Sequence, residues 1–350
     1  MKKALLLFAA LCIATMGFAQ LPFATLTHND SIRVFHGMNA LQSAHAAAVN
    51  GDVINLSSGV FDAVNITKAV TIRGAGMFNN NATGLISTTI RNSFSVNVSD
   101  TVNRLSLIGL YFASGANITM VNVTNPQFLK CRFQSIIQHN YNCHTYNAQF
   151  INCIIQQWIN HSSDNNWYAT GTSFYNCVIL NQGNPSSPDM LVNCIANQSN
   201  NANDINNKTI MNCILYSGNY NTGSNNGYTS FNTIGIYAYY NGRYYSGNFF
   251  DLTNMGTHNL HNYSSSSNPF SLVFQTFRGT YSDGMSMALN ANIATTILGD
   301  DSTQVGIYGG QFPWDPSVSN PLIGHATAGR RTNAQGMLEV NIEILSNDEE

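Results

Sequence analysis

The chain has 350 residues, and 44% of them are hydrophobic, which is enough to bury a full core and excludes a disordered chain. Charged residues make up only 9%, and the formal net charge is −3. Because this balance lacks the basic surface that nucleic acids require, we expect no nucleic-acid partner. Asn, Ser, Thr and Tyr supply much of the polarity, and every Glu lies after residue 338. A chain that avoids good helix formers in this way predicts an all-β fold.

The N-terminal segment has the pattern of an export signal. Lys2 and Lys3 precede an apolar run from Ala4 to Met16, and Gly17-Phe18-Ala19 has the small-residue spacing of a cleavage site. Residues 1–19 are therefore expected to be removed. The apolar run is short for a membrane anchor, so we expect no transmembrane segment after cleavage. The sequence predicts an exported protein, placed in the periplasm, at the cell surface or outside the cell.

A strand or linker is expected over residues 20–36, followed by a capping helix over residues 37–50. Apolar residues recur in the second range at helical spacing, at Met38, Leu41, Ala44 and Ala48. The pair Asn50-Gly51 ends this pattern, as is typical of a helix C-terminus. A stack of coils exposes its first coil, so a helix with an apolar face is expected there as a cap.

Residues 51–265 are expected to form a parallel β-helix, because a short motif recurs there. The motif reads apolar-x-Asn-Cys-apolar-x, and its copies lie at residues 150–155, 174–179, 191–196 and 210–215. A variant at 128–133 has Lys130 in place of Asn, and a degenerate copy follows at 231–234. A period near 20 residues, with short β-branched and aromatic segments, indicates the coils of a solenoid.

Equivalent positions on successive coils of a solenoid stack about 4.8 Å apart. We therefore expect Cys153, Cys177, Cys194 and Cys213 to form an inward ladder of small, unpaired apolar side chains. The Asn positions are expected in turns, with left-handed backbone angles and amides that bond the coils above and below. The spacing does not suit zinc, which favours closer Cys pairs. Cys143 lies off the repeat and is expected to be the most reactive thiol.

A C-terminal closing segment is expected over residues 266–350, and motifs at both ends of the chain are similar to one superfamily. The runs 41–61 and 66–74 resemble the opening of the right-handed parallel β-helix superfamily typified by pectate lyases, with Phe61 where Tyr is usual. Asn268-Pro269-Phe270 and residues 299–310 resemble the closing segment of secreted bacterial members. The resemblance implies an all-β, right-handed parallel β-helix solenoid with an N-terminal capping helix and a C-terminal β-rich cap.

Catalytic motifs of that superfamily are not found. Its polygalacturonase-type members carry Asn-Thr-Asp, Gly-His-Gly and Arg-Ile-Lys, none of which occurs in this sequence. Its lyase-type members use an Arg or Lys base and calcium held by several acids, whereas Asp164, Asp189 and Asp204 are isolated here. We therefore expect no cofactor, with calcium as the alternative that stays open. Whether the protein is an enzyme also stays open.

Two patches are candidates for ligand binding. The first is His161, Asp164, Trp167 and Tyr168, in the longest insertion between repeat cysteines. His with Asp suits acid–base chemistry, and Trp and Tyr offer flat faces to sugar rings. The second patch is Tyr239, Arg243 and Tyr244. The alternative for the first patch is a surface loop of the solenoid with no ligand. The alternative for the second patch is an aromatic stack that closes the solenoid.

Three functions are consistent with these observations. The preferred one is a non-catalytic surface or periplasmic module that contacts a polysaccharide or other glycan. A polysaccharide lyase or glycoside hydrolase with a divergent site is the catalytic alternative. A structural or adhesive solenoid is the third.

Overall fold

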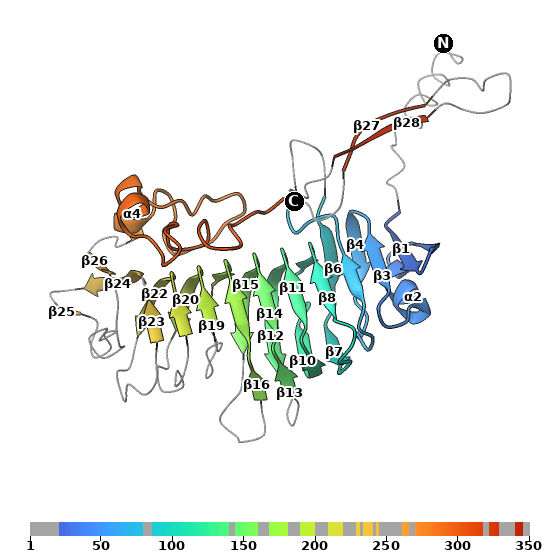
Figure 1. Cartoon of the computed structure of the whole chain (residues 1–350), viewed down its shortest axis with the longest axis horizontal. Coiled ribbons are helices and arrows are strands. Elements are labelled where there is room, and N and C mark those ends of the chain that lie inside the picture. The colour runs from blue at the N-terminus through green and yellow to red at the C-terminus, as the bar shows by residue number, and fades with distance from the viewer. Residues whose placement is uncertain are drawn as a thin grey trace, which may run out of the picture.

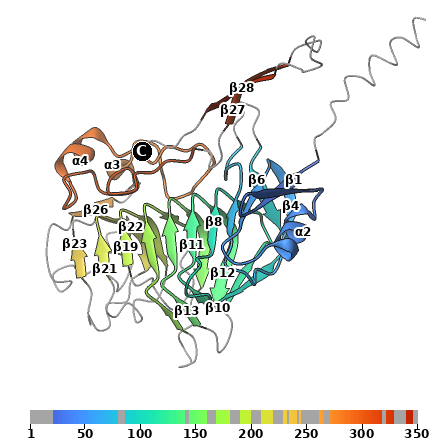
Figure 2. The same ribbon diagram turned by 45° about the vertical axis from the view of Figure 1, so that its right-hand side comes forward.

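The computed structural model describes residues 21–79, 86–139, 144–159, 168–180, 190–199, 209–219, 229–231, 234–240, 243–244, 261–265, 270–317, 322–328 and 340–345. Short strands stack in parallel from coil to coil and build an elongated solenoid (Figures 1 and 2). The predicted all-β fold and parallel solenoid are therefore confirmed. Among the residues described, no helix combines the length and the apolar character needed to cross a membrane.

Two long sheets form the walls of the solenoid. The parallel strands of the first sheet are β3 (Val53–Leu56), β5 (Thr71–Arg73), β8 (Ser106–Ile108), β11 (Gln127–Leu129), β14 (Gln149–Ile151), β17 (Ser173–Tyr175), β19 (Met190–Val192), β21 (Thr209–Met211) and β23 (Thr229–Phe231). The main strands of the second sheet are β4 (Gly59–Asp62), β6 (Thr88–Arg91), β9 (Tyr111–Phe112), β12 (Arg132–His139), β15 (Ile154–Ile159), β18 (Val178–Ile179), β20 (Ile195–Ser199), β22 (Ile214–Asn219), β24 (Ile234–Tyr240) and β26 (His261–Ser265).

Further strands extend the second sheet. They are β7 (Phe94–Val98), β10 (Ile118–Thr124), β13 (His144–Tyr146), β16 (Tyr168–Thr170) and β25 (Arg243–Tyr244). All of them pair in parallel except β25, which runs antiparallel to β24. The repeat motif therefore spans the corner between the sheets: its first residues end a strand of the first sheet, and its last residues begin a strand of the second.

The corner itself depends on the Asn position. Its backbone φ lies between 50° and 54° at Lys130, Asn152, Asn176, Asn193 and Asn212, as expected for the left-handed region. Asn tolerates this conformation better than most residues because its short polar side chain bonds locally. The left-handed turn directs the next residue, the cysteine, into the core, and the chain continues into the second sheet.

Side chains of one kind stack along the core. The rings of Phe128 and Phe150 stack at 4.5 Å, and those of Phe150 and Phe174 at 4.6 Å. The cysteines follow the same rule, since Cys131, Cys153, Cys177, Cys194 and Cys213 are all buried and free. Burial raises the pKa of the Cys177 thiol, which keeps it protonated. The inward ladder of thiols is confirmed, and it behaves as a row of small apolar side chains. Cys143 lies outside the described residues.

The inward ladder makes a prediction for Cys177, which has no exposed surface. Cys177→Asp should lower the free energy of unfolding by about 3 kcal/mol or more, because an unpaired charge would enter a dry core. Cys177→Ala should cost only about 1–2 kcal/mol, as a small cavity in place of a thiol. Denaturant unfolding of both variants measures the difference. An Asp variant as stable as the Ala variant would show that the position faces water.

The N-terminal end of the solenoid is closed by a hairpin and a helix. Strands β1 (Phe23–His28) and β2 (Ser31–His36) pair antiparallel, and β1 continues the first sheet next to β3. The helix expected within residues 37–50 is α2 (Ala40–Ala47), which contacts both strands. Lys68 Nζ donates to the carbonyls of His45, Ala46 and Ala48 at 2.7–2.9 Å. This cation satisfies carbonyls that the helix end leaves open.

His45, in the last turn of this helix, is held in its neutral form. Burial, together with repulsion from Lys68, lowers its pKa from 6.5 to about 4. As the pH falls, His45 is protonated in the unfolded chain before it is protonated in the folded chain. The free energy of unfolding that depends on neutral His45 is therefore fully present above pH 6.5 and is lost as the pH falls towards 4.

His45→Gln should therefore weaken the dependence of stability on pH. Between pH 6.5 and pH 4 the wild type should lose more of its free energy of unfolding than the variant does. Thermal or urea unfolding across that range measures the difference. His36→Gln, at an exposed position, is the control and should follow the wild type. Parallel curves for wild type and His45→Gln would contradict the assignment.

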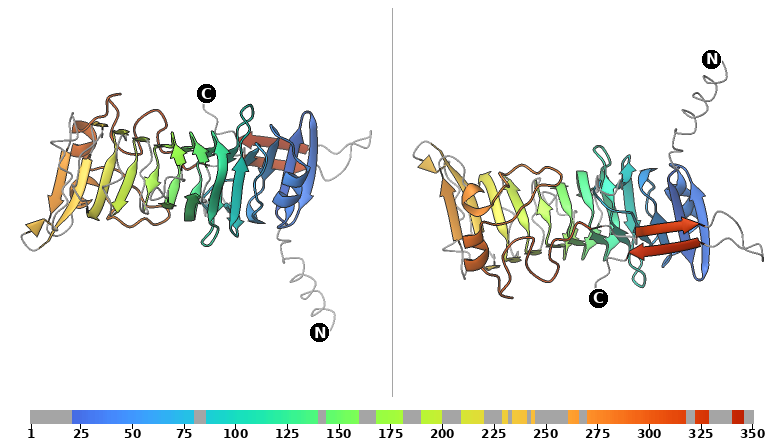
Figure 3. Two further views of the ribbon diagram at one scale, coloured as in Figure 1. Left: turned by 90° about the horizontal axis from the view of Figure 1, so that it is seen from below. Right: turned by 90° about the horizontal axis from the view of Figure 1, so that it is seen from above.

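The closing segment, here residues 270–317, lies along the outer flank of the solenoid (Figure 3). It contains the short helices α3 (Phe270–Val273) and α4 (Ala291–Thr296). The residues that follow Cys153, Cys177, Cys194 and Cys213 pack against the closing segment, so a second core forms outside the solenoid. Its solenoid side is Ile154, Val178, Ile195, Ile214, Tyr216 and Ile234, and its other side includes Val273, Phe274, Phe277, Ile293, Val305 and Ile307. Further on, β27 (Leu322–Ala328) pairs antiparallel with β28 (Val340–Leu345).

Candidate functional site

The side-chain amides of the repeat fasten the closing segment to the solenoid. Asn176 Nδ2 donates to the carbonyls of Ile307 and Gly309 at 2.9 and 2.6 Å. Asn193 Nδ2 reaches the carbonyl of Gly306 at 3.3 Å, and Asn152 Nδ2 that of Pro313 at 3.4 Å. These amides thus bond another segment, whereas the sequence predicts bonds between coils. Backbone donors reach only part of the covering segment, as Gly309 N does for the Gly306 carbonyl and Trp314 N for the Ile307 carbonyl, and the amides supply further donors.

The predicted bond between coils occurs at a different turn. Asn147 Nδ2 donates to Asn125 Oδ1 at 3.0 Å, and both residues have positive φ. This turn lies where the closing segment does not cover the solenoid. The fit at the covered corner is close: a Cβ added to Gly310 would lie 2.5 Å from Asn193 Oδ1. Gly310 also has a φ of 77°, so both this backbone conformation and the nearby Asn193 side chain disfavour any residue other than glycine there.

At the first repeat copy, two ion pairs join the closing segment to the solenoid in place of the Asn amides. Lys130, which holds the Asn position of the first repeat copy, places Nζ 2.5 Å from Asp315 Oδ2 and 3.3 Å from Ser317 Oγ. Burial opposes ionisation of Asp315, but Lys130 and the hydrogen bonds from Ser317 together outweigh it and lower the pKa of that carboxyl. Two residues along, Arg132 Nη1 lies 2.7 Å from Asp283 Oδ2.

The amide contacts make a prediction for Asn176. Asn176→Gly keeps the left-handed turn but removes the amide donor to the Gly309 carbonyl and one of the two donors to the Ile307 carbonyl, which also accepts from Trp314 N, so it should cost about 1–2 kcal/mol of stability. Asn147→Gly removes only an exposed amide and should cost about 0.5 kcal/mol or less. Thermal unfolding and limited proteolysis of residues 299–317 report the two effects. Equal losses in both variants would show that the amides do not hold the segment.

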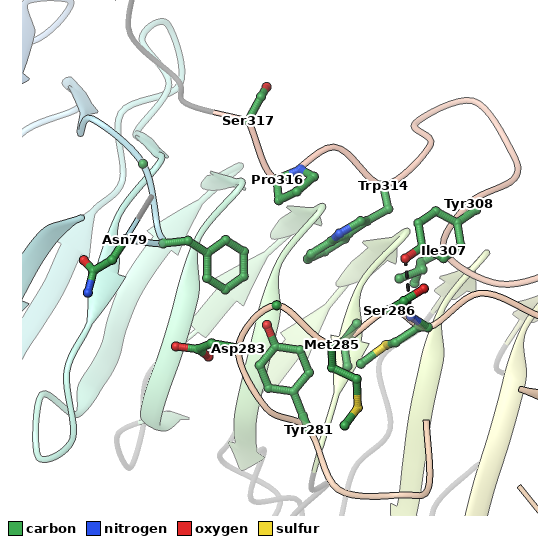
Figure 4. A pocket seen from close by; sticks show the side chains of 15 residues that line it. Asn79, Tyr281, Asp283, Met285, Ser286, Ile307, Tyr308, Trp314, Pro316 and Ser317 are labelled. Atoms are coloured by element: carbon green, nitrogen blue, oxygen red, sulfur yellow. Dashed lines mark hydrogen bonds between the residues drawn. The ribbon is translucent and has the colours of Figure 1, made fainter. Parts of the chain in front are cut away.

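A groove of about 700 Å³ opens between the closing segment and the solenoid, beside these ion pairs. One side is formed by the closing segment, which contributes Tyr281 and Asp283 from one stretch and Trp314 from another (Figure 4). The other side includes Phe78 and Asn79, from the loop after β5. Its remaining lining residues are Gly76, Val178, Gly284, Met285, Ser286, Met287, Ile307, Tyr308, Pro316 and Ser317. This size and mixed lining are typical of a site for a small molecule or a few sugar rings.

Arg132 lies behind this groove, in an aromatic enclosure. Its Cζ lies 4.8 Å from the ring centre of Tyr111, 5.8 Å from that of Phe78 and 5.9 Å from that of Tyr281. These are cation–π distances. Arg132 is 13% exposed and its partner Asp283 is 59% exposed. The carboxylate therefore faces the groove, and the guanidinium is set back from it.

The groove combines flat aromatic faces with a few oxygen and amide groups. Burial raises the pKa of Tyr281, so this ring presents a neutral hydroxyl at ordinary pH. Asp283 is the only carboxylate among the described residues that line the groove, and none of these places a second acid across from it. Within the described part of the chain, no group of three or more His, Cys, Asp or Glu residues could hold a metal ion. The arrangement suits binding of a ligand with both apolar faces and hydroxyl groups.

None of the sequence-predicted site residues is among the described residues that line the groove. His161, Asp164 and Trp167 fall outside the described residues. Tyr168 begins β16, where it pairs with His144 of the preceding coil. In the second patch, β25 brings Tyr244 opposite Tyr239 and Arg243 opposite Tyr240. For these strands the backbone alone is described, and both patches stay predictions.

Sequence reasoning missed the groove because its walls are distant in the chain. Phe78 and Trp314 are separated by more than 200 residues, and no repeat connects them. One signal pointed to it: the repeat positions that hold Asn and an aliphatic residue elsewhere hold Lys130 and Arg132 in the first copy. Comparison of the chain with protein-family models, with curated proteins and with solved structures finds no match. Function is therefore inferred from the groove and from the sequence pattern.

Proposed function

We propose that this protein is an exported, non-catalytic β-solenoid that contacts glycans through the groove between its closing segment and its flank. The observation that carries this proposal is the lining of the groove. Tyr281 and Trp314 reach it from two separate stretches of the closing segment, with Asp283 beside them (Figure 4). Sugar rings have apolar faces that stack on aromatic rings and hydroxyls that bond to carboxylates and amides.

The N-terminal pattern supports export. Lys2 and Lys3, the apolar run and the small residues before Gln20 have the order of a secretory signal. The opening motifs at residues 41–61 and 66–74 support membership of the pectate-lyase-like superfamily. Many proteins of this architecture act at polysaccharides, but a shared fold is weak support for a shared function. The groove therefore carries more of the proposal than the resemblance does.

The catalytic alternative gains less support from the groove. Hydrolysis with inversion needs two carboxyl groups roughly 6.5–9.5 Å apart, and retention needs a closer pair. Asp283 is instead paired with Arg132, and no second carboxyl group is found among the described residues that line the groove. A purely structural role leaves the aromatic lining unexplained. Glycan contact is the function that uses the lining as it stands.

A glycan-array screen with the mature chain, followed by affinity measurements on the hits, tests the proposal. Trp314→Ala should weaken binding about tenfold or more, because a stacking ring would be lost from the groove. Phe312→Ala is the matched control. Phe312 lies on the same stretch but packs on Tyr175 and does not line the groove, so affinity should be unchanged.

Trp167→Ala tests the sequence-predicted patch against the groove. Binding that survives Trp167→Ala and is lost in Trp314→Ala supports the groove. Binding lost only in Trp167→Ala would move the site to the patch with His161 and Asp164. Release of product from a bound glycan would contradict the non-catalytic role.

A further inference from the structure

We infer that the groove selects uncharged saccharides and discriminates against uronates, that is, sugars whose ring carries a carboxylate. This inference rests on the proposed function and concerns the same site. Its basis is the arrangement of charges around the groove: the two described cations beside it, Lys130 and Arg132, are each paired with a carboxylate, and Asp283 lines the groove.

Among the described residues, Asp283 is the only charged side chain that lines the groove. It is 59% exposed, so a ligand that enters meets its carboxylate. A uronate placed next to it would bring two negative charges together in a partly desolvated site, where repulsion is stronger than in water. A sugar hydroxyl at the same place instead donates a hydrogen bond to the carboxylate.

Arg132 is poorly placed to offset this repulsion, because Nη1 and Nη2 each have a partner, Nε is buried and an aromatic ring covers the guanidinium. Nη1 is bound to Asp283, and Nη2 donates to Gln134 Oε1 at 3.1 Å. Nε is buried away from any ligand. The nearest ring, that of Tyr111, lies 4.8 Å from Cζ and covers the guanidinium. A ligand carboxylate would therefore have to displace Asp283 before it could reach the cation.

Lys130 is neutralised in the same way. Its ammonium group contacts both Asp315 and Ser317, and neither Lys130 nor Asp315 lines the groove. The other described lining residues with polar groups in their side chains are uncharged: Asn79, Tyr281, Ser286, Tyr308, Trp314 and Ser317. The remaining hydrogen-bonding capacity of the groove therefore suits hydroxyl groups, and no cation of the lining is free for a carboxylate.

Two matched pairs of oligosaccharides test this selectivity. The first is α-1,4-linked galactotetraose and tetragalacturonate, and the second is cellotetraose and the β-1,4-linked glucuronate tetramer. Within each pair the rings and linkages are the same, and only the C6 group changes from hydroxymethyl to carboxylate. At low ionic strength, calorimetry with the mature chain should show the neutral member of the better-binding pair bound about tenfold or more tightly.

Variants identify the source of the preference. Asp283→Asn removes the facing charge and frees Arg132, so the preference should fall by about tenfold or reverse in favour of the uronate. Asp315→Asn removes the other carboxylate that joins the closing segment to the solenoid, outside the groove, and should leave the ratio unchanged. Thermal unfolding of both variants shows whether the segment stays in place.

The outcomes separate this inference from the proposed function. A neutral preference that Asp283→Asn abolishes supports both. Tighter binding of a uronate that Trp314→Ala removes would overturn the inference and keep the groove as the glycan site. Equal binding within both pairs would overturn the inference in the same way. Absence of binding to all four tetramers would overturn the selectivity, and absence of any hit on the glycan array would overturn the proposed function.

Discussion

The left-handed turn at the Asn position is the constraint on which the rest of the structure depends. It joins the two sheets in each coil, directs a cysteine inwards and leaves an amide on the outside of the corner. Because the turn recurs in register, the amides form a row, and that row holds the closing segment through its backbone carbonyls. One residue type therefore sets both the shape of the coil and the place of the cover.

The motif serves two cores at once. The cysteine of each copy enters the solenoid, and the next residue, such as Val178 or Ile195, is buried on the outside under the closing segment. An outward aliphatic side chain on an uncovered solenoid would stay in water, so the cover explains why this position is apolar in successive copies. Removing the closing segment would expose a continuous apolar row along the second sheet.

Period and alternation were sufficient to predict the coils, the corner and the thiol ladder, because these depend on contacts between equivalent positions of neighbouring repeats. The closing segment obeys no repeat, so its path and its contacts with Asn152, Asn176 and Asn193 could not be predicted. The same applies to the groove, whose lining combines a loop near residue 78 with residues 281–317. Predicted patches near residues 161–168 and 239–244 depended on residue types alone, with no contact to define them.

The groove lies where the repeat loses its regularity. In most copies an Asn and an aliphatic residue flank the cysteine, and the closing segment packs tightly on them. At Cys131 the flanking residues are Lys130 and Arg132, whose long side chains reach Asp315 and Asp283 instead. Charged side chains of that length need partners and hydrogen bonds at their ends, so the two layers cannot close into a dry core there. Lys130 and Arg132 thus hold this end of the closing segment, and the space beside them is the groove that is available to a ligand.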